Sequence, residues 1–324
     1  MKTKVLSIIL AVAVLFGVMQ VSVFASDSNA ITVYFSATSD EIIVPLKALT
    51  VKDGTAEEYG FTVNTVDHNN KAVNGVSVFD VIVTAHIVYY GEKFTKETAS
   101  EYLAISGGYL QKAFGKPATA SGFAVNGKVP HDDIMTSYGY TGYAADTAVV
   151  AAGDLVSFYF YQDTKGYTDV LASLGTNEIT LKPGESYTYT LSGYYAAWYG
   201  CYDDATIASK TEALNDVDVF MKEANDKTFT KVGTTDDNGQ LKVTFEKEGE
   251  YTLYATGETD AECPIVYTWS VAHVTNEVPA NPEPQNNPSI MEKVVKALEN
   301  VLQFVYNVIV RVERFFSGIF NIFK

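Results

Sequence analysis

Histidine, cysteine and the motifs built on them are scarce in this sequence. Its 324 residues include four histidines and two cysteines, and the phosphate-binding loop and the HExxH, GxSxG and GxGxxG patterns are absent. The histidines lie far apart along the chain, and nothing singles out two of the 39 acidic residues as a pair for glycoside hydrolysis. The sequence therefore predicts no catalytic residues, no metal site and no cofactor, and we expect a protein that is not an enzyme.

Basic residues are also scarce, with 23 Lys and Arg against 39 Asp and Glu. The charge is uneven, because residues 26–288 carry about −20 whereas residues 289–324 carry +2. Such an acidic segment repels phosphate backbones, which argues against nucleic acid as a partner. The 22 Tyr and 18 Phe supply enough apolar area for folded cores, so the composition is not that of a disordered chain.

Residues 1–25 have the composition of a secretory signal peptide. Lys2 and Lys4 precede an apolar stretch, and Val23-Phe24-Ala25 closes it with a small-residue cleavage pattern. We expect a secreted or extracellular protein associated with the cell envelope; an uncleaved membrane span is the less favoured alternative. In an exported chain, Cys201 and Cys263 permit one disulfide, and two separate buried thiols are the alternative.

Residues 26–165 predict a mixed α+β domain. Ile31 to Ala37 and Phe61 to Asp67 alternate in the manner of strands. Apolar residues at helical spacing across 76–90 predict a helix, which Ser77 would cap.

Residues 166–275 predict an immunoglobulin-like β-sandwich of short alternating strands separated by turn signals. Pro183-Gly184 predicts a turn between two such strands. Thr234–Gly239 begins like a calcium-binding loop but lacks the acidic ligand at the twelfth position, so a hairpin turn is the favoured interpretation. Residues 195–214 fit no period and are expected to form a long loop, with or without a helical turn. We therefore expect a mainly β protein.

Residues 276–289 are a linker rich in proline and asparagine, and residues 290–324 have the pattern of an amphipathic helix. The apolar stripe would be covered by self-association, by a membrane surface or by another envelope protein; folding back onto the chain is less favoured. The residues expected to carry this assembly or membrane contact are Leu298, Leu302, Val305, Ile309, Val312 and Phe316.

Candidate ligand-binding residues gather around the turn Asn126-Gly127. Aromatic side chains that grip a partner or stack on a sugar are common in binding surfaces. The adjacent His131-Asp132-Asp133 cluster predicts a solvated loop rather than a metal site, because further ligands cannot be named. The residues expected to contact a ligand are Phe123, Asn126, Tyr138, Tyr140 and Tyr143.

Four stretches resemble the transcobalamin-like C-terminal domain family of bacterial surface proteins. They are Val76 to Ala85, Gly107 to Gly115, Gly122 to Pro130 and Ala148 to Tyr161. The resemblance covers about residues 30–163 and implies a β-grasp-like fold, a mixed sheet clasping a helix, with Phe123 where the family's hairpin usually has Trp. The stretch from Asp236 to Gly257 resembles bacterial immunoglobulin-like modules.

These expectations together favour a non-catalytic binding or adhesion protein, with an unknown surface ligand or an envelope protein as its partner. Capture of a small ligand, corrinoid or carbohydrate, is one alternative, and a structural surface subunit is another.

Overall fold

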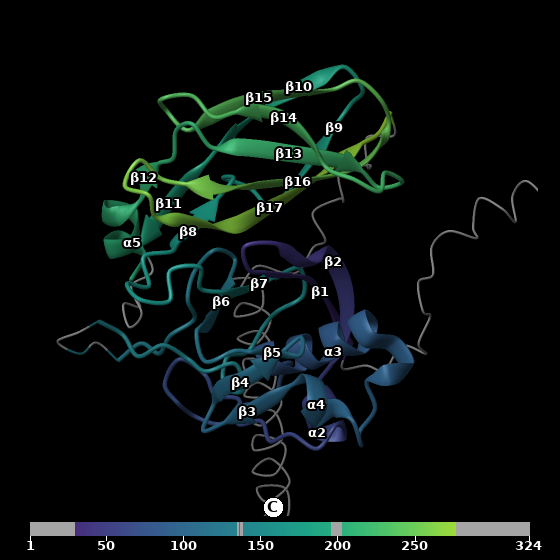
Figure 1. Cartoon of the computed structure of the whole chain (residues 1–324), viewed down its shortest axis with the longest axis vertical. Coiled ribbons are helices and arrows are strands. Elements are labelled where there is room, and N and C mark those ends of the chain that lie inside the picture. The colour runs from purple at the N-terminus through teal and green to yellow at the C-terminus, as the bar shows by residue number, and fades with distance from the viewer. Residues whose placement is uncertain (1–29, 135, 137–138, 196–202, 277–324) are drawn as a thin grey trace, which may run out of the picture. The chain divides into compact units, whose positions relative to one another are not determined.

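The computed structural model describes residues 30–134, 136, 139–195 and 203–276. These residues form a mainly β protein with several sheets, as the sequence predicts (Figure 1). Residues up to Val274 form one compact unit, and a second unit begins at Thr275. The expected signal peptide, the linker beyond Asn276 and the helix of residues 290–324 lie outside the described residues and stay predictions.

The first module is built on a four-stranded sheet in the order β2-β1-β7-β6. β1 (Ala30–Thr38) pairs antiparallel with β2 (Ile42–Lys52) and parallel with β7 (Leu155–Phe160), and β7 pairs antiparallel with β6 (Ser121–Val125). Two antiparallel pairs joined through parallel central strands, with a helix packed on the sheet, make the β-grasp arrangement. The predicted fold of this module is confirmed.

The helix of this module, α3 (Val78–Tyr90), begins where the sequence predicts, at the cap residue Ser77. The Ser77 hydroxyl accepts a hydrogen bond from the Asp80 N–H at 2.9 Å, and the Asp80 carboxylate accepts one from the Ser77 N–H at 2.8 Å. This reciprocal capping box satisfies two N–H groups that the first turn of a helix leaves free. The helix start is therefore set locally, before packing against the sheet.

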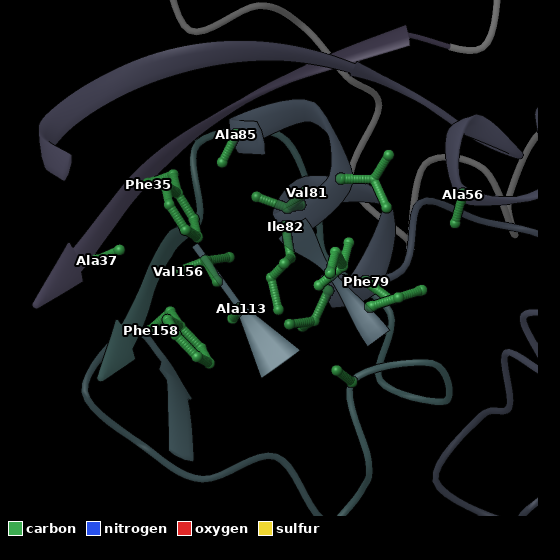
Figure 2. Packing of buried hydrophobic residues seen from close by; sticks show 14 of the residues in the cluster. Phe35, Ala37, Ala56, Phe79, Val81, Ile82, Ala85, Ala113, Val156 and Phe158 are labelled. Atoms are coloured by element: carbon green, nitrogen blue, oxygen red, sulfur yellow. The ribbon is translucent and has the colours of Figure 1, made fainter. Parts of the chain in front are cut away.

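One apolar core joins α3 to the sheet and to the small strands that follow it (Figure 2). Burying large apolar side chains is the main source of folding stability. The labelled members of this core are Phe35, Ala37, Ala56, Phe79, Val81, Ile82, Ala85, Ala113, Val156 and Phe158.

Short elements complete the first module. β3, β4 and β5 form a separate three-stranded sheet in sequence order. The short elements are α2 (Thr55–Glu58), η1 (Gly91–Lys93), α4 (Ala99–Tyr102), β3 (Ala104–Ser106), β4 (Tyr109–Ala113) and β5 (Lys116–Pro117).

The second module is the predicted β-sandwich. Its larger sheet has the order β12-β11-β8-β17-β16-β13-β14, with β9 also paired to β17, and β10 pairs with β15 in a second sheet. The strands are β8 (Val170–Ser173), β9 (Glu178–Leu181), β10 (Glu185–Thr190), β11 (Ser192–Tyr195), β12 (Glu212–Ala213), β13 (Asp218–Glu223), β14 (Thr230–Thr234), β15 (Gln240–Phe245), β16 (Gly249–Glu258) and β17 (Pro264–Val274).

Two predicted turns connect strands in a different way from a hairpin. β9 and β10 flank Pro183-Gly184, but β9 pairs with β17 and β10 with β15, so the turn carries the chain from one sheet to the other. The turn at Pro183-Gly184 is present as predicted, but the expected hairpin at Thr234–Gly239 is wrong, because β14 pairs with β13 whereas β15 pairs with β10. Alternating strands look alike in sequence whichever sheet they join, because both sheets bury one face.

The stretch 195–214, expected as a long loop with or without a helical turn, contains the helix α5 (Asp204–Lys210). Asp203 is its cap, since its side chain accepts a hydrogen bond from the Thr206 N–H at 2.8 Å. No helix within the described residues is long and apolar enough to cross a membrane.

The connector between β7 and β8 is fixed by two carboxylates. Asp163 accepts hydrogen bonds from the N–H groups of Lys165 at 3.0 Å and Gly166 at 2.9 Å. Asp169 accepts them from Gln162 at 2.8 Å and from Asp163 at 3.0 Å. The backbone hydrogen bond from Gly166, with others from Thr168 and Lys165, lowers the pKa of Asp163 to about 2.

Candidate functional site

The predicted turn at Asn126-Gly127 is present at the end of β6. Asn126 and Gly127 have φ values of 52° and 75°, and Val125 and Lys128 exchange two backbone hydrogen bonds of 2.8 and 3.1 Å. Two successive positive φ values define the tight turn that Asn-Gly favours. Only one bridge follows the turn, however, and the pairing partner of β6 is β7.

The Asn126 side chain fastens this turn to the start of β7. Its Oδ1 accepts a hydrogen bond from the Leu155 N–H at 2.9 Å, and its Nδ2 donates to Asp154 Oδ1 at 2.8 Å. Asn177 Nδ2 adds a weaker donor to Asn126 Oδ1 at 3.3 Å. The structure thus gives Asn126 a structural part, and its expected contact with a ligand stays a prediction.

The remaining predicted ligand residues divide into two groups. Phe123 is half-buried against the core of the first module, where it stands opposite Phe158 in the β6–β7 register. Tyr138 lies outside the described residues. Tyr140 and Tyr143 are brought together with two histidines, in what we call the tyrosine cluster: His68, His131, Tyr140 and Tyr143.

Ring contacts organise the tyrosine cluster. The Tyr140 ring stacks on the His131 imidazole, with centroids 4.4 Å apart and planes 7° from parallel. The ring centroids of Tyr143 and His68 are 6.5 Å apart. The Tyr143 hydroxyl donates a hydrogen bond to the Asp67 carbonyl at 2.7 Å. Burial, and then the negative charges of Asp132, Asp67 and Asp133, raise the pKa of Tyr143, so its phenol stays neutral and remains a donor.

Asp132 departs from the solvated loop that the sequence predicts, because the residue is 4% exposed. Asn70 Nδ2 donates to Asp132 Oδ2 at 3.1 Å, and the Thr141 N–H donates to Oδ1 at 3.2 Å. Burial acts to raise the pKa of Asp132, but these hydrogen bonds outweigh it and lower the pKa overall. Asp133 stays exposed, 3.8 Å from the His68 imidazole. Asp132 therefore organises the loop, and only Asp133 offers a carboxylate to solvent.

His86 forms a second polar centre, which the sequence placed only on a helix. It is fully buried, its Nδ1 bonds the Ile82 carbonyl at 2.8 Å, and its Nε2 accepts the Phe114 N–H at 2.8 Å. Because the Phe114 N–H can only donate, Nδ1 must carry the proton. Burial lowers the pKa of His86 to about 4, so the ring is neutral in ordinary conditions.

Aromatic rings surround His86 and reach the surface. The Phe114 ring stacks on the imidazole at 4.0 Å, and Tyr89 lies edge-on to Phe114 at 5.5 Å while its own side chain is 50% exposed. The ring centroids of Tyr90 and Tyr102 are 4.1 Å apart, at the same end of α3. These rings cover the histidine and leave one tyrosine face open to solvent.

A cavity of about 440 Å³ lies between the turn after β2 and the segment 63–74. Asp53, Glu57 and Asp80 line it. The Asp80 oxygens already accept hydrogen bonds from the Ala56 N–H at 2.7 Å and from the Ser77 hydroxyl at 2.6 Å. Burial raises the pKa of Asp80 in spite of these bonds. The Asp80 carboxylate is thus used by the fold itself.

Cys263 is a buried thiol whose sulfur lies 3.5 Å from the Ala261 carbonyl. Its expected partner Cys201 lies outside the described residues, so the disulfide stays a prediction. Among the residues that the structure describes, no three His, Cys, Asp or Glu side chains are grouped so as to hold a metal ion.

No known protein family matches this sequence, and no curated protein matches it. Among solved structures, the D00-D0 domain of intimin is similar over 46% of this chain and 78% of that chain, with 9% sequence identity and a TM-score of 0.16. A TM-score this low leaves both fold and function to be argued from the residues of the chain itself.

Proposed function

We propose that this chain is a non-catalytic binding protein of the cell surface or the extracellular space. The β-grasp module contacts the partner, the immunoglobulin-like module acts as a spacer, and residues 290–324 attach or assemble the chain. The observation that carries the proposal is the exposed tyrosine at the tip of the β3–β4 turn, beside the segment that contains the tyrosine cluster.

Tyr109 is 75% exposed, which is unusual for so large a ring. It follows Gly108, where an added Cβ would lie 2.9 Å from Ala144 and 3.1 Å from Asp146. That close approach sets the tip of the turn against the segment just after Tyr143. Exposed tyrosines backed by ordered polar groups are typical of binding surfaces, because a rigid ring buries much area at little entropic cost.

Two groups with strongly lowered pKa values support a role without catalysis. His86 and Asp163, whose pKa values are about 4 and about 2, use their hydrogen bonds on neighbouring backbone groups. A catalytic acid or base needs a free position facing its substrate. These two groups hold the backbone instead.

Kinship with the transcobalamin-like C-terminal domain is part of the proposal. The sheet order β2-β1-β7-β6 and the Asn126-Gly127 turn support it. Carbohydrate capture is a second candidate function, favoured by the flat Tyr140–His131 ring pair near the exposed Asp133, because sugars bind on aromatic faces flanked by carboxylates.

Two measurements test the proposal on the full chain. Intact cells that express it are treated with protease, and we expect the chain to be digested from outside. The purified chain is then applied to an array of extracellular matrix proteins and glycans. We expect binding to weaken by roughly 30-fold in Tyr109→Ser, the loss of one interface hot spot.

The matched control is Tyr195→Ser, because Tyr195 is 43% exposed but belongs to the second module. It should bind like the unmodified chain. The proposal would be contradicted if the protease digested the chain only after the cells were lysed. Equal binding by Tyr109→Ser and Tyr195→Ser would also contradict it. Binding to glycans alone, lost in Tyr140→Ser, would select the carbohydrate candidate.

A further inference from the structure

Both modules close in the same way, with their first strands paired in parallel with their last strand. In the first module β1 pairs with β7. In the second module β8 and β9 both pair with β17. The chain therefore enters each module at one end of a parallel pair and leaves it at the opposite end.

The parallel pair of the first module is well buried. Its register runs from Tyr34 opposite Leu155 to Thr38 opposite Tyr159. Phe35 and Phe158, on the two paired strands, are fully buried in the core. Separating β1 from β7 therefore breaks the hydrogen bonds of the pair and also exposes the centre of the core.

The second module uses β17 for two parallel contacts. Near its start β17 pairs with β8, at Ile265 opposite Val170, and near its end it pairs with β9, from Val271 to Val274. The Val271 N–H donates to the Asn177 carbonyl at 2.9 Å, which adds a bond just before β9 begins. Both contacts join strands near the start of the module to the strand that leads out of it.

The direction of these strands decides how tension acts on them. Hydrogen bonds of a parallel pair cross between the strands at even spacing. Pulling the start of one strand and the end of the other slides the two strands past each other along their length, so all the bonds are loaded together. Two adjacent ends pulled apart would instead load the bonds one after another, beginning at that end.

We propose that the chain is built to withstand tension between its two ends, with β1–β7 and β9–β17 as the two pairs that resist it. The connector between the modules fits this arrangement, because Asp163 and Asp169 hold its backbone in place. The inference rests on strand direction alone and does not depend on which partner the chain binds.

Single-molecule pulling of the full chain tests the proposal by changing only the points of attachment. Handles at Ala30 and Asn276 load both pairs in the sliding direction. Handles at Ala30 and Ala152 load the β1–β7 pair from one end, because Ala152 lies just before β7. Handles at Lys182 and Asn276 do the same for β9–β17. All four positions are exposed, so the handles disturb the cores little.

We expect unfolding forces severalfold lower for the two one-end attachments than for end-to-end attachment at the same pulling speed. Unfolding under force reports the unfolding rate along the pulled direction, so equal equilibrium stability does not equalise the forces. Urea unfolding of each handle variant, measured without force, should give the same midpoint. Equal or higher forces in the one-end geometry would overturn the proposal for that module.

Discussion

Asn126 Nδ2 donates a hydrogen bond to Asp154 Oδ1 at 2.8 Å, and this contact ties the turn that ends β6 to the turn that begins β7. The two residues are 28 positions apart. Each belongs to a turn that contains a glycine of positive φ, Asn126-Gly127 and Gly153-Asp154. Their contact brings the edge strand β6 into register with β7, at the sheet end where the expected ligand residues were placed.

Replacing Asn126 should therefore cost stability. In Asn126→Ala the Leu155 N–H loses its partner, and alanine is less tolerant than asparagine of a φ of 52°. We expect the free energy of unfolding to fall by about 2–3 kcal/mol, measured by urea titration. Asn177→Ala, which removes only the exposed 3.3 Å bond, should cost much less. Equal losses in the two variants would speak against the structural part of Asn126.

His86 should make the first module sensitive to acid. Its folded pKa of about 4 lies below the ordinary value of 6.5, so the folded state binds fewer protons than the unfolded state between these two values. The contribution is fully present above pH 6.5 and is lost as the pH falls towards 4. The loss amounts to about 3 kcal/mol over this window, followed by urea midpoints at several pH values.

The variant His86→Phe isolates this effect. It leaves the Phe114 N–H unpaired, so stability at pH 7.5 should fall by about 1–3 kcal/mol. The additional loss between pH 6.5 and 4 should become smaller, because the titrating ring is gone. His68→Asn is the control, since the His68 side chain is 70% exposed. An unchanged pH slope in His86→Phe would refute the assignment.

The capping box of α3 should be measurable on its own. Ser77→Ala removes the hydroxyl that accepts the Asp80 N–H and donates to the Asp80 carboxylate at 2.6 Å. We expect a loss of about 1–2 kcal/mol in the free energy of unfolding. Thr84→Ala, which removes a hydroxyl bonded to the Asp80 carbonyl within the same helix, should be close to neutral. A reversed order of the two costs would be incompatible with the cap.

Gly122 should tolerate no side chain, for reasons of space. A Cβ there would lie 2.6 Å from the Tyr159 hydroxyl oxygen, and Tyr159 is 2% exposed in a buried cluster with Leu171 and Val266. Gly122→Ala should lose about 1–3 kcal/mol. In a Tyr159→Leu background the same change should cost less, because the hydroxyl and the ring carbons Cζ and Cε2, which lie 2.7 and 3.0 Å from that Cβ, are missing. A double-mutant cycle of urea midpoints checks this, and purely additive costs would show no contact.

Features set by neighbouring residues were predictable from the sequence. The start of α3 follows from Ser77 and Asp80, which are three positions apart and complete the capping box without help from the rest of the fold. The turn at Asn126-Gly127 likewise follows from the ease with which these two residues adopt positive φ values. The sandwich arrangement follows from the order of such local signals along the chain, whereas the β-grasp arrangement was implied by the resemblance of four stretches to a known domain family.

Features that depend on distant partners were not predictable. Asp132 looked solvated because its donor Asn70 is 62 positions away. His86 was placed on a helix, but the burial that keeps its imidazole neutral and the hydrogen bond from the Phe114 N–H, 28 positions later, both depend on the rest of the fold. The strands on either side of Pro183-Gly184 were recognised, yet the side-chain pattern of a strand carries no label for the sheet that it joins.

The connector between β7 and β8 bears on how long such a protein would survive among secreted proteases. Segments between modules are the usual places of proteolytic nicking, because a protease must draw the backbone into an extended form. Here Asp163 and Asp169 hold four backbone N–H groups of the connector, and a protease would have to break those bonds before cleaving. We therefore expect digestion to start elsewhere, so that the two modules persist as one piece.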